Sequence, residues 1–165
     1  MPSLSIGDEA PNFDLSSTED AVLMLRDEVA RTSVVVYFFA DPTNAGAHRD
    51  LDALSQHLDR LARLRARVLA VSPAPLDALK KLQAGRKLLF PLLHDDRSFS
   101  AAYGVTGDPA LVVVSRKQRI LWLANPVDAV AEALPQVEKA LEKEPSPAKS
   151  YPKSVINKLV DKIVN

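Results

Sequence analysis

The stretch SVVVYFFADPTNAGAHRDLDALSQHL, residues 33–58, decides the fold of this chain. After Ser33, its first residues are all β-branched or aromatic, which is typical of a buried central strand. A turn-rich segment follows at 41–46. The next segment carries one apolar stripe at helical spacing, formed by Leu51, Leu54, Leu58 and Leu61. The stretch therefore predicts a buried strand, a turn and an amphipathic helix in direct succession.

Strands and helices keep alternating along the rest of the chain. Further strands are predicted near residue 15 and at 21–25, 67–72, 88–93, 110–115 and 119–123. Further helices are predicted at 76–84, where Gly85 ends the helix, after Asp95 or Asp96 as a cap, and at 127–143. This order predicts an α/β fold with a mixed central β-sheet flanked by helices, in which the last two strands form a hairpin.

The composition changes beyond residue 143, which predicts three parts. Residues 1–143 are the α/β domain, and 144–152, with three prolines, are a linker. A C-terminal amphipathic helix extension is predicted at 153–165, with an apolar stripe formed by Val155, Ile156, Leu159, Val160, Ile163 and Val164. So short a helix needs a surface to cover its stripe, which is either its own domain, a second copy of the chain in a homodimer, or a protein partner.

Charge and composition exclude several classes of partner. Twenty-one basic residues balance 21 acidic ones, so we expect neither a nucleic acid nor a membrane as partner. The longest apolar runs are too short to cross a bilayer, and residues 1–10 are polar, so a cytoplasmic location is expected. The chain has no cysteine, which excludes disulfides, thiolate metal sites and redox pairs. We expect no metal and no cofactor.

Three stretches resemble the peroxiredoxin (AhpC/TSA) family, in that family's order. They are GDEAPNFDL at 7–15, VLAVSPAPLDALKKL at 68–82 and LLFPLLHDDRSFSAAYGV at 88–105. The resemblance covers about residues 4–143 and is strongest to the bacterioferritin-comigratory-protein branch. It implies a thioredoxin-like fold and, for the family, a thiol peroxidase activity.

The family motif that carries the chemistry departs from the pattern in this chain. The resemblance places the loop proline at Ala40, the threonine at Asn44 and the peroxidatic cysteine at Ala47. The family arginine before the strand that begins at Ala110 aligns with Pro109. That cysteine attacks peroxide as a thiolate, the threonine orients the peroxide and the arginine stabilises charge. Because alanine has no nucleophile, we expect no catalytic residue here and a loss of thiol peroxidase activity.

Two function hypotheses from different classes remain. In the first, the protein is a non-catalytic binding or scaffold protein, which uses its C-terminal stripe or a vestigial pocket formed by Asn44, Gly46, Ala47, His48 and Pro109. In the second, the natural protein is a thiol-dependent peroxide reductase whose cysteine an engineered alanine has replaced at position 47. Four departures rather than one favour the first hypothesis.

Two more positions carry expectations from the residues themselves. Pro109 resembles the proline that enters a strand of the thioredoxin fold through a cis bond, so a structural role is expected for it. His48 is interpreted as a solvated or capping side chain rather than a general base. The run His94-Asp95-Asp96 holds metal-ligand residue types, but helix capping explains its carboxylates without a metal.

Overall fold

In a computed structural model of the chain, which describes residues 4–106 and 109–144, the sheet is the centre of the molecule. Seven strands pair in the order β2-β1-β5-β4-β3-β6-β7. Their bounds are β1 (Asp14–Ser17), β2 (Val22–Met24), β3 (Ser33–Phe38), β4 (Ala66–Ser72), β5 (Leu92–His94), β6 (Ala110–Val114) and β7 (Ile120–Ala124). The three central strands β3, β4 and β5 are parallel, and the other strands pair antiparallel. The sheet is therefore mixed, as the sequence predicts.

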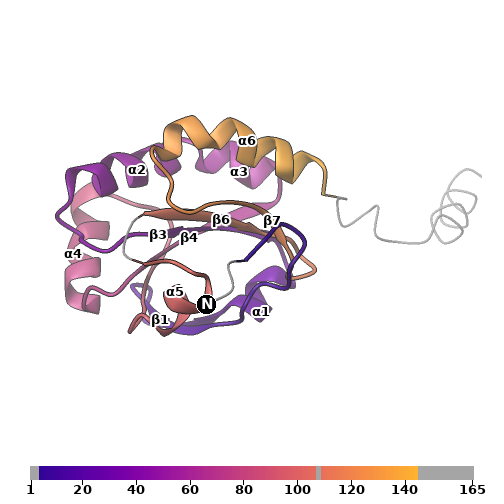
Figure 1. Cartoon of the computed structure of the whole chain (residues 1–165). Helices are drawn as coiled ribbons and strands as arrows, with labels where there is room; N and C mark the ends of the chain where they lie inside the picture. The colour runs from indigo at the N-terminus through magenta and orange to yellow at the C-terminus, as the bar shows by residue number, and fades with distance from the viewer. Residues whose placement is uncertain (1–3, 107–108, 145–165) are drawn as a thin grey trace, which may run out of the picture.

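Six helices in the described part of the chain cover the sheet on both faces, as Figure 1 shows. They are α1 (Leu25–Val29), α2 (Ala45–Gln56), α3 (Leu58–Arg63), α4 (Leu76–Arg86), α5 (Ser98–Ala102) and α6 (Val130–Glu142). Apolar residues of α2, α3, α4 and α6 form one buried cluster with one face of the sheet. The other face packs with α1, the segment before β1 and the end of α5. Each face of β3 thus has a core of its own.

Strand β3 is buried along its whole length, because it lies between β4 and β6 with helices on both faces. Neighbouring residues point to opposite faces, so Tyr37 and Phe39 pack under α2 and Phe38 packs on the α5 side. Strands β3, β4 and β5 end at one edge of the sheet, where the loops to α2, α4 and α5 begin. In open α/β sheets, ligands bind at this carboxyl edge.

The structure corrects two helix boundaries. The stripe from Leu51 to Leu61 is divided between α2 and α3 at His57, whose ring Nδ1 makes a hydrogen bond of 2.9 Å with the Ala53 carbonyl and so takes the acceptor of the next helical turn. Helix α4 continues through Gly85 to Arg86, and Lys87 ends it with a φ of 53°. Arg86 pairs with Asp52 of α2, which fixes this last turn.

Several expectations fall outside the part of the chain that the structure describes. They are the linker after Glu144, the helix at 153–165 and the Asp108–Pro109 bond. The Asn125–Pro126 bond, which is described, is cis. In residues 4–106 and 109–144, no helix is long and apolar enough to cross a membrane.

Candidate functional site

Ala47 lies in the first turn of α2, directly after the loop that leaves the carboxyl end of β3. Its side chain is buried, with 3% exposure, and belongs to the core beneath α2. Its backbone N–H donates to Oδ1 of Asn44 over 3.0 Å. Asn44 has extended backbone angles and is the N-cap of the helix. At the aligned position of the family nucleophile, the chain therefore has a buried methyl group and a satisfied N–H.

Gly46 gives the cap the space it needs. A Cβ built on Gly46 lies 3.0 Å from the Oδ1 of Asn44, closer than side chains normally approach. A larger residue here pushes the capping amide away from the helix. The glycine before the aligned cysteine position thus has a structural role in this chain.

The loop before α2 is held by its own polar groups. Thr43 donates its N–H and its hydroxyl to Oδ1 of Asp41, over 2.8 and 2.7 Å. Both bonds, the backbone bond more strongly, lower the pKa of Asp41. Nε2 of His48 lies 2.6 Å from the Pro42 carbonyl and makes a hydrogen bond with it. The half-buried His48 therefore binds the loop through a carbonyl and not an N–H group of the helix, so it is not a helix cap.

Pro109 lies at the same edge of the sheet, just before β6. Its carbonyl accepts the N–H of Val127 over 2.8 Å, and the next residue, Ala110, pairs with Phe38 of β3. An arginine at position 109, as in the family pattern, would place a side-chain donor next to the end of β3. The proline present in this chain has no such donor. Four of the residues of the pocket predicted from sequence, Asn44, Gly46, Ala47 and His48, lie at the start of α2, and Pro109 precedes the strand that pairs with the end of β3. Among these five residues, Asn44 and His48 have polar side chains, and the Oδ1 of Asn44 is used as the helix cap.

A buried carboxylate supports this region from beneath. Asp50 is 5% exposed, and its Oδ2 accepts the Tyr37 hydroxyl over 2.7 Å. Its Oδ1 accepts the backbone N–H of Val130, the first residue of α6, over 3.1 Å. Asp50 therefore links α2, β3 and α6, and burial with the Asp50 hydrogen bond raises the pKa of Tyr37. Asp50 directly precedes Leu51 of the apolar stripe, and an acidic residue at that place in the predicted helix is the sequence feature that could have indicated this network.

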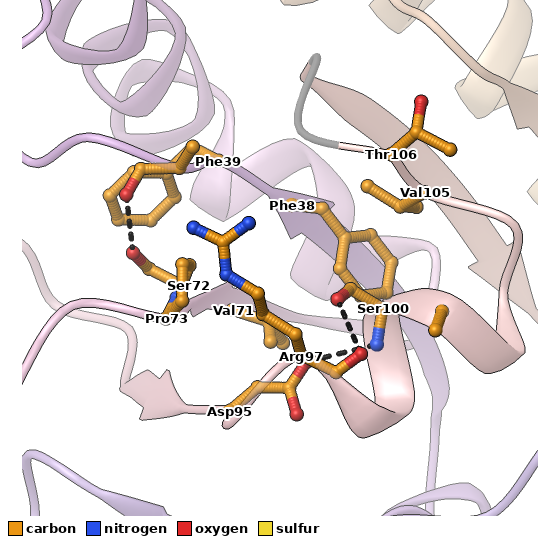
Figure 2. A pocket seen from close by; sticks show the side chains of 12 residues that line it. Phe38, Phe39, Val71, Ser72, Pro73, Asp95, Arg97, Ser100, Val105 and Thr106 are labelled. Carbon is orange, nitrogen blue, oxygen red and sulfur yellow. Dashed lines mark hydrogen bonds between the residues drawn. The ribbon is translucent and has the colours of Figure 1, made fainter.

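A separate cavity of about 240 Å³ opens at the carboxyl edge, on the α5 side of the sheet (Figure 2). The ends of β3 and β4 contribute Phe38, Phe39 and Val71, and the loop before β6 contributes Val105. The remaining lining residues are Ala40, Ser72, Pro73, Asp95, Arg97, Ser100, Ala101 and Thr106. Ala40, the aligned position of the family proline, is the member of the vestigial motif that reaches this cavity. The lining is mostly apolar.

Arg97 is the cation of this cavity. Figure 2 shows its side chain extending from the start of α5 across the space between Phe38 and Phe39. In residues 4–106 and 109–144, no carboxylate pairs with its guanidinium. The backbone of Arg97 has a φ of 81°, a conformation that favours glycine and is strained for any other residue. The sequence alone did not single out Arg97.

The carboxylates next to Arg97 are used to cap α5. Asp95 is buried and accepts the N–H groups of Phe99 and Ser100, over 3.2 and 2.9 Å. Asp96 accepts the N–H of Ser98 over 3.0 Å, and the Ser98 hydroxyl and N–H lower the pKa of Asp96. This confirms the predicted capping. Among the described residues, no group of three or more His, Cys, Asp or Glu side chains is placed to hold a metal ion.

Comparisons with known proteins agree with this architecture. The model of the AhpC/TSA family matches residues 6–123. Alkyl hydroperoxide reductase E of Mycobacterium tuberculosis is 30% identical over 112 residues, which are 65% of this chain and 72% of that protein.

Two solved structures share the fold. Peroxidoxin BcpB of Mycobacterium tuberculosis superimposes with a TM-score of 0.80 at 18% identity, covering 87% of this chain and 99% of that one. A cysteine-to-serine mutant of PrxQ from Xylella fastidiosa superimposes with a TM-score of 0.78 at 20% identity, covering 86% and 98%. The fold is therefore thioredoxin-like, with a seven-stranded mixed sheet between helices. Because the family model matches most of the length of this chain, the chain, although it has no cysteine, belongs to the AhpC/TSA family of peroxiredoxins.

Proposed function

We propose that this protein is a non-catalytic binding protein, which has kept the peroxiredoxin fold and lost its thiol peroxidase activity. The observation that supports this is the state of the first turn of α2. Ala47 has a buried methyl group there, and Asn44 caps its N–H. Since the whole sequence has no cysteine, no other thiol replaces the missing one.

The nearby hydroxyl groups do not replace the thiol either. An alcohol becomes a nucleophile when a general base removes its proton. The Thr43 hydroxyl donates to Asp41, an exposed carboxylate whose lowered pKa makes it a weak base. The Ser72 hydroxyl is buried and donates to the Ala40 carbonyl over 3.3 Å. Neither hydroxyl is hydrogen-bonded to a histidine in the described part of the chain.

A peroxide assay tests the proposal directly. The full chain is mixed with hydrogen peroxide or an organic hydroperoxide and a thiol reductant, and peroxide loss is followed over time. We expect no loss above that of the reductant alone, because the reaction needs a thiolate. Catalytic turnover above this background contradicts the proposal.

The second hypothesis, an engineered loss of the cysteine, is tested by the variant Ala47→Cys. A thiol at this position gains from the helix N-terminus, but it lies in an apolar core and has no family arginine at 109. We therefore expect its reaction with peroxide to stay within about tenfold of that of an ordinary free thiol. Ala45→Cys, on an exposed residue of the same helical turn, is the matched control.

A fast peroxidase reaction in Ala47→Cys and not in Ala45→Cys supports the enzyme hypothesis instead. It means that the rest of the site still activates a thiolate. Slow reaction in both variants means that the surroundings of residue 47 have lost that ability together with the cysteine.

A further inference from the structure

We propose that the cavity beside Arg97 binds a small monocarboxylic acid with a short apolar or aromatic body. This deepens the proposed binding function by naming a ligand class for a site other than the first turn of α2. Three features of the cavity support this class of ligand: the position of one cation, the apolar walls and the volume.

The cation selects an anion. The Arg97 guanidinium extends into the space between Phe38 and Phe39 and has no carboxylate partner in the described part of the chain. A guanidinium offers two parallel N–H donors, which match the two oxygens of a carboxylate. Arg97 is the arginine in the lining of this cavity.

The neighbouring charge limits the ligand to one negative charge. Asp95 lines the same cavity, and both of its oxygens accept N–H groups of α5. Arg97 neutralises one negative charge of a ligand. The second charge of a dianion would have no cation in the lining and would be repelled by the Asp95 carboxylate. The cavity therefore favours a carboxylate over a phosphate dianion.

The walls and the volume describe the body of the ligand. Phe38, Val71 and Val105, from the core on the α5 side of the sheet, give an apolar surface on which an aliphatic chain or an aromatic ring packs. The volume of about 240 Å³ is below the range of about 300–1,000 Å³ for drug-sized ligands. An apolar cavity of about 150 Å³ holds one benzene molecule, so one ring with a carboxylate fits this space.

The test measures binding of benzoate and hexanoate to the full chain by NMR titration. We expect saturable shifts of the amides of Phe38, Phe39 and Val105 with both acids. Benzyl alcohol, which has the ring without the charge, and inorganic phosphate, which has charge without an apolar body, should each bind at least about tenfold more weakly.

Two pairs of variants locate the site. Arg97→Gln should weaken benzoate binding about tenfold or more, and Arg97→Lys, which keeps the charge but not the two parallel donors, should weaken it less than Arg97→Gln does. Both variants keep a side chain at the strained position. Ala101→Phe fills the cavity from α5 and should abolish binding, whereas Ala102→Phe, on an exposed neighbour outside the lining, should not.

Four outcomes overturn the inference: no saturable binding of either acid, equal binding of benzyl alcohol or phosphate, no effect of Arg97→Gln, or no effect of Ala101→Phe. None of them bears on the peroxide assay, which measures a different reaction. A failure here leaves the loss of peroxidase activity intact, and turnover of peroxide leaves the carboxylate site intact.

Discussion

Two regions at the same edge of the sheet differ in how their polar groups are used. We call the first turn of α2, which follows β3, the closed region, because its polar groups bond within the chain. Ala47 is buried there, Asn44 caps the Ala47 N–H, and Asp50 bonds to Tyr37 and Val130 beneath it. We call the start of α5, which follows β5, the open region, because a cavity lies there. Arg97 has a strained backbone at this point and extends its guanidinium into the cavity.

The difference supports the proposed ligand site at the start of α5. In the closed region, the Asn44 Oδ1, the Tyr37 hydroxyl and the Asp50 carboxylate are bonded within the chain, so a ligand gains little by competing for them. In the open region, Arg97 has no carboxylate partner among the described residues and lies beside apolar walls, at a cost in backbone strain. Strain of this kind is found at functional sites more often than elsewhere. We therefore expect a ligand at the start of α5 rather than at the first turn of α2.

The largest expected effect concerns the closed region. Asp50→Ala leaves the Tyr37 hydroxyl and the Val130 N–H buried without their acceptor. We expect the free energy of unfolding to fall by about 2–4 kcal/mol, measured by urea denaturation. Asp14→Ala, which removes an exposed carboxylate on β1, should change it by no more than about 0.5 kcal/mol. A loss that small for Asp50→Ala means that the region is not held by this network.

The helix cap gives the next effect. Asn44→Ala removes the acceptor of the Ala47 N–H, and we expect a loss of about 1 kcal/mol in unfolding free energy. Asn44→Thr places the residue of the family pattern there and should recover most of the loss, because threonine also caps helices. Equal stability of all three proteins contradicts the cap as a stabilising contact.

The open region should respond in the opposite direction. Arg97→Gly removes a side chain from a φ of 81°, so we expect the free energy of unfolding to rise by up to about 1 kcal/mol. Arg49→Gly, at an exposed position inside α2, should lower it by about 1 kcal/mol, since glycine disfavours helices. If Arg97→Gly is as destabilising as the control, the backbone at Arg97 stores no strain.

The last prediction has no effect at neutral pH and appears only in alkali. Burial raises the pKa of Tyr37 beneath α2 and of Tyr103 on the α5 side. Because the unfolded chain releases these protons near pH 10 and the folded chain keeps them, stability is complete below pH 10 and falls as the pH rises further. Absorbance at 295 nm and circular dichroism, followed together, should show both tyrosines ionising only as the chain unfolds.

Asp50→Asn separates the two tyrosines. The Asp50 hydrogen bond and charge add to the raised pKa of Tyr37, whereas burial alone raises that of Tyr103. The variant should therefore lower the pKa of Tyr37 and leave Tyr103 unchanged. Ionisation of either tyrosine near pH 10 in the folded wild-type protein contradicts its burial.

The sequence predicted the sheet and most of its flanking helices because strand burial and helix periodicity are local patterns, but it missed α1, whose five residues are too few to show a helical period. The run Ser33 to Phe39 is apolar on both sides, and the strand is indeed buried on both faces. The break at His57 was missed because it depends on a side-chain hydrogen bond to Ala53, which leaves the apolar spacing unchanged. Gly85 was misassigned because the Arg86–Asp52 pair extends α4 beyond it.

The positions of the family motif could be located from the resemblance to the family, but the cavity could not. Ala47, Asn44 and Ala40 follow one another in a single loop and helix turn, so a linear pattern is enough to find them. The cavity is lined by residues from the ends of β3 and β4 and from α5. Arg97 lines it with a positive φ, a backbone conformation that an arginine in the sequence does not predict. Only the folded chain brings these segments together.

The attachment of Glu144 has a practical consequence. Its carboxylate accepts the Ser33 hydroxyl and, over 2.8 Å, the Arg116 N–H, so the last described residue is fixed at the amino end of β3. The cavity lies at the other end of that strand, six residues or roughly 20 Å away. A fluorophore attached to the exposed Lys117, in the turn beside Glu144, would therefore sit at the opposite end of β3 from the proposed ligand cavity, where it leaves the Arg97 edge uncovered.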